Sequence, residues 1–336
     1  KSDLKSLEIS HDVFISENAL LEEGHVNKAY KYLEDKKLLY KGNTNPPKGS
    51  KNDEWSEKKH ILFKSKSFGD DEDRVVKKHD GQWTYFMPDI AYHLNKYERG
   101  FIRMINIFGA DHSGYIARMK AAVKAVTNEK ANLEIKTCQL VRLSRGGKPV
   151  KMSKRAGSFI TLKEIVNEVG KDAVRFMMVS RKNDAQLDFD FEVFKNENND
   201  NPIFYIQYAN ARISSLIRNS KEKLGRDIKD KDLINADLTF LQNENEKKII
   251  FQIANFPKVI EQSVTFMEPH RLSYYLRDLA SSFHQYWNLK IDNKRIHILD
   301  KSEIDLSLAR VALLFAVSIT IQTGLGLLGI EAIEEL

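Results

Sequence analysis

Residues 104–109 read Met-Ile-Asn-Ile-Phe-Gly, a short apolar run that ends at a glycine. A run of this length, rich in Ile and Phe and followed by a helix breaker, predicts a buried β-strand. Residues 114–126 then read as a helix, and residues 134–143 are again strand-like. A strand, a helix and a second strand in this order predict a parallel α/β sheet.

The segments before this unit continue the pattern less regularly. Residues 83–86 (Trp-Thr-Tyr-Phe) are β-prone, and residues 89–97 read as a helix. Closer to the amino terminus, one helix is expected over 16–39. Residues 61–63 and 74–76 are expected to form short strands around an acidic turn.

After about residue 195 the strand signal fades and helical spacing takes over. Pro202 follows Asn201 at the start of a predicted helix, and apolar residues recur at helical spacing over 272–286. This part therefore reads as an all-α bundle. Residues 311–330 carry no charge and are long enough to span a bilayer, but they include several polar residues and glycines. We expect a buried bundle helix there and no membrane contact.

The composition is that of an ordinary globular protein. The chain has 336 residues, of which 42% are hydrophobic and 30% charged, and 53 Lys and Arg residues against 47 acidic ones give a net charge of +6. A mild basic excess permits a nucleic-acid partner without demonstrating one. Cys138 is the only cysteine, which excludes an intramolecular disulfide and a cysteine zinc cluster and favours a reducing cytoplasm.

A cationic loop follows the second strand. Residues 144–149 are rich in Gly and Pro, and residues 151–157 read Lys-Met-Ser-Lys-Arg-Ala-Gly. Ammonium groups and free backbone N–H groups suit a polyphosphate, whereas the alternative is an ordinary solvated basic loop.

This loop resembles the KMSKS signature of class I aminoacyl-tRNA synthetases, in the form found in arginyl-tRNA synthetases. Further segments resemble the same family in the same order along the chain: 85–100, 109–115, 172–190 and 201–212, with 268–272 far downstream.

The resemblance implies an α/β fold, the second half of a Rossmann-like parallel-sheet catalytic domain, followed by an all-α anticodon-binding bundle. We expect the end of an insertion over 1–80, the catalytic half over 81–195 and the anticodon-binding domain over 196–336. The family's His-Ile-Gly-His signature matches none of the nine histidines. The chain starts at Lys1, which reads as a cut. We therefore expect the carboxy-terminal portion of a longer enzyme, inactive by itself.

The implied activity is that of an arginine–tRNA ligase. Its expected partners are L-arginine, ATP and tRNA(Arg), with Mg²⁺ on the ATP phosphates and no protein-bound zinc, in a cytoplasmic monomer. Two alternatives remain: a non-catalytic tRNA-binding module, and a synthetase for another amino acid. A cysteinyl enzyme would rely on zinc, for which this chain has no cysteine cluster.

The resemblance also implies functional residues. Catalysis is assigned to Lys151 and Lys154. The expected sets are Gly109, Asp111, His112, Lys151, Met152, Ser153 and Lys154 for ATP, Tyr85, Asp89 and His112 for arginine, and Tyr205, Tyr208 and Arg212 for tRNA.

Each assignment has a structural alternative. Asp89 could simply cap a helix, and which group of arginine it would meet stays open. Asp111 and His112 could belong to an ordinary turn. Tyr205, Tyr208 and Arg212 fall on one helical face, which could bind bases and phosphates or could be core.

Overall fold

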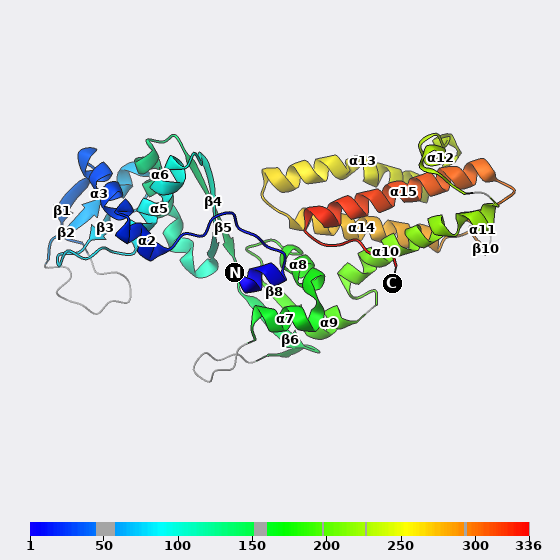
Figure 1. Cartoon of the computed structure of the whole chain (residues 1–336), viewed down its shortest axis with the longest axis horizontal. Coiled ribbons are helices and arrows are strands. Elements are labelled where there is room, and N and C mark those ends of the chain that lie inside the picture. The colour runs from blue at the N-terminus through cyan, green and yellow to red at the C-terminus, as the bar shows by residue number, and fades with distance from the viewer. Residues whose placement is uncertain (45–57, 151–159, 197, 226, 292–293, 336) are drawn as a thin grey trace. The chain divides into compact units, whose positions relative to one another are not determined.

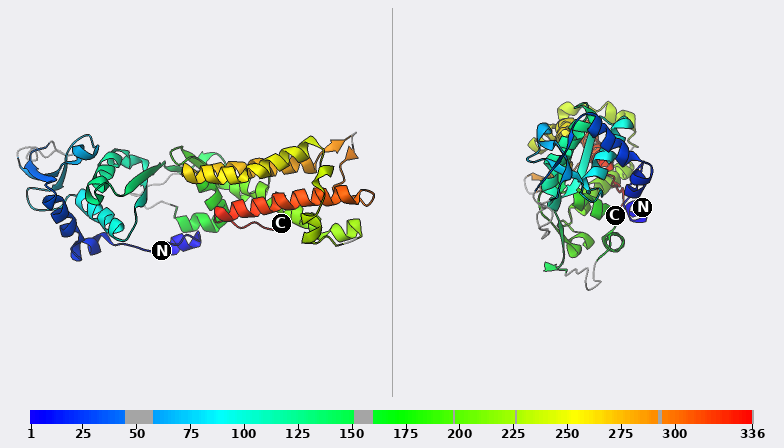
Figure 2. Two further views of the ribbon diagram at one scale, coloured as in Figure 1. Left: turned by 90° about the horizontal axis from the view of Figure 1, so that it is seen from above. Right: turned by 90° about the vertical axis from the view of Figure 1, so that its left-hand side faces the viewer.

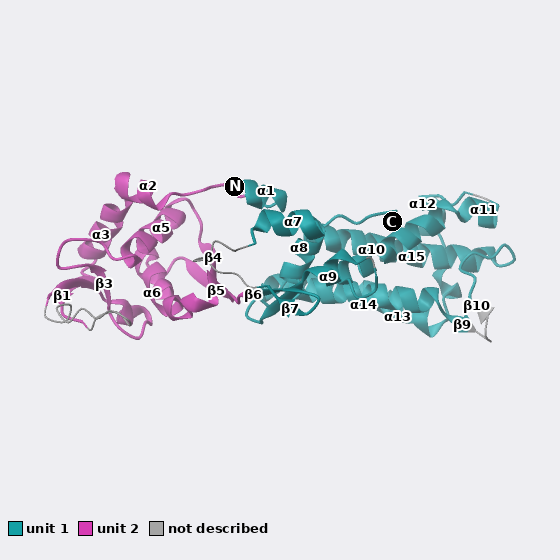
Figure 3. Cartoon of the chain, turned by 90° about the horizontal axis from the view of Figure 1, so that it is seen from below, with its two compact units in different colours: residues 1–10, 141–336 teal, residues 11–140 magenta. Residues whose placement is uncertain are grey.

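The computed structural model describes residues 1–336 except 45–57, 151–159, 197, 226, 292–293 and 336. The chain divides into two compact units, which are coloured separately in Figure 3. Unit 1 contains residues 1–10 and 141–336, and unit 2 contains residues 11–140. Each unit has its own hydrophobic core.

Unit 2 combines helices with two small sheets (Figure 1). Its elements are α2 (Glu17–Glu22), α3 (His25–Asp35), β1 (Leu39–Gly42), β2 (His60–Phe63), η1 (Ser65–Phe68), β3 (Arg74–Lys77), α5 (Phe86–Glu98), β4 (Arg103–Gly109), η2 (Ala110–Tyr115), α6 (Ile116–Thr127) and β5 (Asn132–Cys138).

The predicted parallel pair is confirmed. β4 and β5 run parallel with Met104 opposite Leu133, and α6 connects them. Helices α5 and α6 pack on one face of this pair, and Met87, Met119 and Met104 belong to the same buried core. Burial of such side chains supplies the main driving force for this part of the fold, at about 25 cal/mol per Å².

The other face of β4 differs from the prediction of a buried strand. Ile105 and Ile107 are 47% and 63% exposed, while Met104 and Asn106 on the opposite face are buried. Successive side chains of a strand point to opposite faces. Among the described residues, helices cover only the face that carries Met104 and Asn106.

Three further predictions about unit 2 need correction. Residues 83–86 form no strand, because only Trp83 makes a bridge, to Lys77, and α5 begins at Phe86. The helix expected over 16–39 is interrupted at Gly24, whose φ is +78°. The strand expected over 134–143 is two strands, β5 and β6, which belong to different units.

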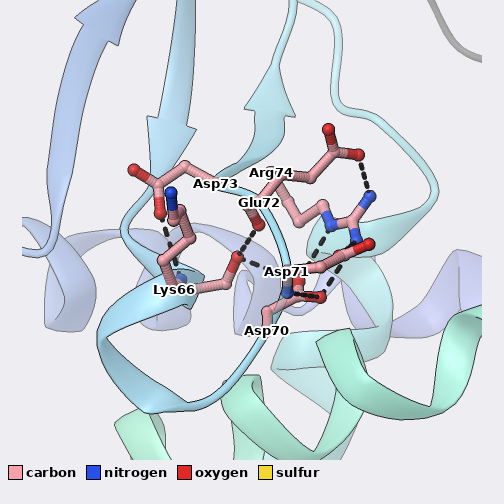
Figure 4. Close-up of polar contacts among 7 residues, drawn as sticks. Lys66, Asp70, Asp71, Glu72, Asp73 and Arg74 are labelled. Atoms are coloured by element: carbon pink, nitrogen blue, oxygen red, sulfur yellow. Dashed lines mark hydrogen bonds and ion pairs between the residues drawn. The ribbon is translucent and has the colours of Figure 1, made fainter.

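The acidic turn between β2 and β3 is held by one arginine (Figure 4). Arg74 donates to both carboxylate oxygens of Asp70, from Nε at 2.8 Å and from Nη2 at 2.9 Å, and it also contacts Asp71 and Glu72. Burial raises the pKa of Asp70, but the hydrogen bonds from Arg74 and Asp71 outweigh it and lower the pKa to about 2. The turn thus contains a buried carboxylate that is charged and fully paired.

Unit 1 begins with a small α/β part and continues as helices. Its elements are α1 (Ser2–Ser6), β6 (Val141–Arg145), β7 (Lys148–Pro149), α7 (Leu162–Val169), α8 (Lys171–Val179), β8 (Leu187–Asp190), α9 (Phe191–Lys195), α10 (Pro202–Arg218), α11 (Ser220–Leu224), α12 (Asp230–Ile234), η3 (Leu238–Phe240), α13 (Glu244–Thr265), α14 (His270–Trp287), β9 (Lys290–Ile291), β10 (Lys294–Arg295) and α15 (Ile304–Leu327).

The helical bundle predicted for the later residues is confirmed. α10 is capped by the Asn201 side chain, which accepts from Phe204 N, and Pro202 occupies its first turn. Helices α10, α13, α14 and α15 pack on one another, and Figure 2 shows α13 in yellow beside α15 in orange to red.

One helix in the described part of the chain, α15, is long and apolar enough to cross a membrane. More than half of its most apolar window, 56%, is buried inside the protein, where Val311, Leu314 and Val317 belong to the bundle core. This burial is typical of a core helix, as the sequence predicted.

Candidate functional site

A cavity of about 680 Å³ lies in unit 2, between α5, β4 and η2. Its lining consists of Tyr85, Asp89, Tyr92, His93, Lys96, Ile105, Asn106, Ile107, Phe108, His112, Tyr115 and Met119. Asp89 is the only carboxylate in this lining. The apolar side chains around it suit a hydrocarbon stem, so the cavity fits a molecule with an apolar middle and a cationic group.

The position of Asp89 follows from how α5 begins. Thr84 Oγ1 donates to the carbonyl of Val75 at 2.7 Å, which fastens the segment before the helix to β3. Pro88 is tolerated because it lies in the first turn. The helix N-cap is Tyr85, and the Asp89 side chain makes no capping hydrogen bond. The alternative that Asp89 caps this helix is therefore wrong.

The Asp89 carboxylate instead accepts a hydrogen bond from a residue on η2. Tyr115 Oη donates to Asp89 Oδ2 at 2.7 Å. Burial raises the pKa of Asp89, whereas the bond from Tyr115 and the charges of Lys96 and His112 lower it. Burial also raises the pKa of Tyr115 and keeps it protonated as the donor. Asp89 is thus a desolvated acceptor whose orientation is fixed.

A polar chain that the sequence analysis missed reaches the same residue. His93 Nδ1 lies 2.7 Å from the carbonyl oxygen of Asp89, and His93 Nε2 lies 2.8 Å from Asn106 Nδ2. Lys96 Nζ donates to Asn106 Oδ1 at 3.4 Å. Burial lowers the pKa of His93 to about 4, so its imidazole is neutral at pH 7. The helical spacing of His93 from Asp89 was the available signal.

Among the described residues, the others predicted for arginine and ATP lie at the rim of this cavity or outside it. Tyr85 lines the cavity with a side chain that is 88% exposed. His112 also lines it, and His112 Nε2 lies 3.6 Å from Asp111 Oδ2. Gly109 and Asp111 are not part of the lining. A Cβ at Gly109 would lie 2.5 Å from Asp111 Oδ1, which is the end of an exposed side chain that can move aside.

The predicted phosphate-binding residues Lys151, Met152, Ser153 and Lys154 lie outside the described residues. The hairpin before them is described. Its two-residue turn, Gly146-Gly147, has both φ values positive, which glycine adopts readily.

That turn is anchored by a residue whose role the sequence did not reveal. Asp190, at the end of β8, accepts from Gly146 N at 3.0 Å, from Gly147 N at 2.6 Å and from Ser144 Oγ at 3.0 Å. These bonds lower the pKa of Asp190, and the bond from Gly147 has the largest effect. A carboxylate therefore fixes the turn between β6 and β7.

The predicted tRNA residues lie on α10 and form part of an aromatic stack with α14. The rings of Tyr205 and Tyr208 lie 4.5 and 5.6 Å from that of His284. The Arg212 guanidinium lies over the Tyr208 ring at 4.1 Å and over the Trp287 ring at 5.6 Å. Tyr205 also packs against the bundle core. Tyr208 and Arg212 remain partly exposed, which leaves them accessible to a ligand.

The same described residues offer no metal centre. They contain no group of three His, Cys, Asp or Glu side chains that could hold a metal ion.

Two family models match the chain. Residues 53–220 match the model described as tRNA synthetases class I (R), catalytic domain. Residues 206–336 match the DALR anticodon binding domain.

Curated relatives match over the whole chain. An arginine–tRNA ligase from Parvibaculum lavamentivorans is 51% identical over 336 residues, which is 100% of this chain and 58% of the relative. An arginine–tRNA ligase from Rhodospirillum rubrum is 47% identical over 338 residues, covering 57% of that protein. The chain thus spans a little more than half the length of these relatives.

Solved structures agree with this. A crystal structure proposed to be an arginyl-tRNA synthetase from Campylobacter jejuni matches all of this chain and 67% of its own, with a TM-score of 0.81 and 32% identity. The arginyl-tRNA synthetase of Thermus thermophilus shares the fold, with a TM-score of 0.77 at 21% identity and 62% of that chain covered.

Proposed function

The chain belongs to the class I arginyl-tRNA synthetases, and on this premise we propose that it provides the arginine-binding cavity and the tRNA-binding bundle of an arginine–tRNA ligase. The observation that carries the proposal is the Asp89 carboxylate, which lies in an otherwise carboxylate-free lining and accepts from Tyr115. A permanently charged, planar guanidinium needs such an acceptor.

The proposed reaction has two steps. An oxygen of the arginine carboxylate attacks the α-phosphorus of ATP, and the bond to pyrophosphate breaks, which gives arginyl-adenylate. The 2′-hydroxyl of the terminal tRNA adenosine then attacks the activated carbonyl carbon, and AMP leaves. Neither step needs a covalent enzyme intermediate, so catalysis consists of positioning and charge stabilisation.

In this proposal Asp89 meets the guanidinium of arginine. Ile105, Ile107 and Phe108 are apolar lining residues suited to the methylene groups of its side chain. Tyr85 and His112, at the exposed rim, contact the remainder of the amino acid, and Gly109, Asp111 and His112 face the adenosine. Lys151 and Lys154, with the backbone of Met152 and Ser153, hold the β- and γ-phosphates. Mg²⁺ bound to these phosphates would neutralise part of their charge.

The bundle supplies the second binding surface. We propose that Tyr208 and Arg212 contact tRNA(Arg), with Tyr205 supporting the stack from the core side. Aromatic rings stack on unpaired bases, and a guanidinium pairs with phosphate. The match of residues 206–336 to an anticodon-binding family supports this placement. The reaction would take place in the cytoplasm, in a protein that acts as a monomer.

We also propose that residues 1–336 by themselves do not activate arginine. No two of the nine histidines have the spacing of a His-Ile-Gly-His signature. A non-catalytic tRNA-binding module therefore remains the second candidate for this chain taken alone.

Kinetics of arginine activation test the cavity. In an arginylation-competent protein that carries this sequence, Asp89→Asn should raise the KM for arginine by more than tenfold and leave the KM for ATP within about twofold. Each factor of ten corresponds to about 1.4 kcal/mol of lost binding. Glu98→Gln, which changes an exposed carboxylate of α5 paired with Lys28, is the matched control. An unchanged KM for arginine in Asp89→Asn would contradict the proposal that this cavity binds arginine.

A further inference from the structure

Two separate contacts fix Asp89, one on its carboxylate and one on its backbone. We propose that Tyr115 and His93 are positioning residues for arginine binding: Tyr115 orients the carboxylate, and His93 holds the helical turn that carries it. This inference rests on the proposed function of the cavity and assigns roles to residues that the family pattern and the sequence analysis left without one.

Tyr115 determines which way the Asp89 carboxylate faces. Its hydroxyl donates to Oδ2 at 2.7 Å, and no group among the described residues donates to the Asp89 side chain at Oδ1. An ionised carboxylate oxygen has two acceptor positions, so Oδ2 can still accept a second bond while Oδ1 stays open to ligand. A guanidinium could therefore bind both oxygens in the plane that Tyr115 sets.

The Tyr115 ring is itself held in place by its neighbours. It packs edge-on against Phe86 at 5.9 Å and against Phe108 at 6.3 Å. The Arg118 guanidinium covers it at 5.1 Å. Because the ring cannot swing freely, its hydroxyl defines a fixed point for the carboxylate.

The second contact has only one consistent arrangement of protons. The Asp89 carbonyl can only accept, so the proton of His93 lies on Nδ1 and is donated to that carbonyl. His93 Nε2 must then accept from Asn106 Nδ2. This leaves Asn106 Oδ1 facing the Lys96 ammonium group. With a neutral imidazole, each of these three contacts joins a donor to an acceptor.

This chain links α5 to the sheet. His93 and Lys96 are on α5, whereas Asn106 is a buried residue of β4. The hydrogen bonds therefore set the position of the helix turn at Asp89 relative to the strand that forms another wall of the cavity. Displacements of about 1 Å in such supports can cost about a hundredfold in rate.

A conservative variant tests the role of Tyr115. Tyr115→Phe keeps the packed ring and removes only the hydroxyl. Measured by amino-acid-dependent ATP–pyrophosphate exchange in an arginylation-competent protein, it should raise the KM for arginine about tenfold and leave the KM for ATP within twofold. Tyr97→Phe, which changes a tyrosine of α5 outside the cavity lining, is the matched control and should change neither constant.

The pH profile separates positioning from a structural effect. The charged or titratable groups that face the Asp89 carboxylate are Lys96 from α5 and Tyr115 and His112 from η2, while His93 contacts the Asp89 backbone carbonyl. Because the Tyr115 bond lowers the pKa of Asp89, its loss should move the acidic limb of kcat/KM for arginine to higher pH. A merely packing role for Tyr115 leaves that limb where it is.

The role of His93 has a spectroscopic test. ¹⁵N NMR of the histidine side chains in the folded protein at pH 7 should show His93 as the neutral Nδ1–H tautomer, and Asn106→Ala should shift the Nε2 resonance. A protonated His93, or the Nε2–H tautomer, would overturn the proposed chain even if Asn106→Ala proves too unstable to study.

The outcomes distinguish this inference from the function on which it rests. If Asp89→Asn raises the KM for arginine but Tyr115→Phe behaves like Tyr97→Phe, the positioning role of Tyr115 is overturned and the cavity assignment stands. If Asp89→Asn also leaves the KM for arginine unchanged, the proposed function of the cavity is itself contradicted.

Discussion

The guanidinium of Arg175, on α8, donates two hydrogen bonds to the carbonyl oxygen of Leu328, from Nε at 3.1 Å and from Nη2 at 2.8 Å. Its Nη1 donates to the carbonyl of Leu7 at 2.6 Å. One side chain thus ties together α8, the residue that follows α15 and the residue that follows α1, all within unit 1.

This contact requires glycine at position 329. Gly329 has a φ of +68°, and a Cβ there would collide with the Arg175 guanidinium. We expect Gly329→Ala to lower the free energy of unfolding by about 2 kcal/mol or more, from backbone strain and loss of the Arg175 bonds. Urea unfolding measures it. The control is Gly326→Ala, where a Cβ meets nothing within 4 Å; equal effects of the two changes would contradict the expectation.

The buried ion pair of unit 2 should stabilise the protein in a defined pH range. The pKa of Asp70 is lowered to about 2 in the folded protein, so its contribution is complete above the unfolded value near 3.8 and is lost as the pH falls towards 2.

Asp70→Asn should therefore destabilise the protein by roughly 3 kcal/mol at pH 7, because Arg74 loses its buried partner. The difference from the unchanged protein should shrink in acid. Asp71→Asn alters an exposed partner of the same arginine and should cost less than about 1 kcal/mol. Thermal melting from pH 2 to 7 gives both values, and a pH-independent difference would exclude the assigned pairing.

Two variants of α10 separate charge from stacking in tRNA binding. The logarithm of the binding constant should fall linearly with the logarithm of the salt concentration. Arg212→Ala should make this slope less steep by about one unit, because one phosphate contact is lost. Tyr208→Ala should weaken binding by about 1–3 kcal/mol and leave the slope unchanged. Filter binding over a salt series measures both. Should Tyr208→Ala instead lower the melting temperature and spare tRNA affinity, the tyrosine acts as core.

Lys154 should act on the leaving pyrophosphate. Since charge develops there in the transition state, Lys154→Ala should lower kcat by about a hundredfold, a loss of roughly 3 kcal/mol, and change the KM for arginine little. Lys163→Ala, an exposed lysine of α7, serves as the control. An unaltered kcat in pyrophosphate exchange would rule out this role.

The local sequence was sufficient to predict an element where a single local interaction determines where it begins or ends. The apolar run that ends at Gly109 predicted β4, and Asn201-Pro202 predicted the start of α10, because caps and breakers act within a few residues. The predicted class, a parallel-sheet catalytic part followed by a helical anticodon-binding domain, is confirmed by the two family models. The domain boundaries at residues 80 and 195 stay predictions.

The errors arose where tertiary contacts determine the secondary structure. Residues 83–86 have β propensity, but Phe86 is buried as the first residue of α5, and packing overrides a weak local preference. The strand pattern of 134–143 is continuous in sequence, although the chain passes from one unit to the other at residue 140.

The candidate site was predicted only in part for a similar reason. Asp89 and Tyr85 were predicted from a family pattern of a Tyr and an Asp four residues apart, and both line the cavity. The bond from Tyr115 to Asp89 spans 26 residues, and that between Asn106 and His93 spans 13. Such pairs depend on the packing of α5 against β4 and η2, and no local signal in the sequence specifies them.

Discrimination between arginine and citrulline tests most directly whether Asp89 binds the guanidinium. Citrulline matches arginine in shape but replaces the charged guanidinium with a neutral urea group. In ATP–pyrophosphate exchange by an arginylation-competent protein with this sequence, the ratio of kcat/KM for arginine over citrulline should fall by at least about a hundredfold in Asp89→Asn. A ratio that stays as high as in the unchanged protein would contradict the assignment and place the recognition of the guanidinium elsewhere.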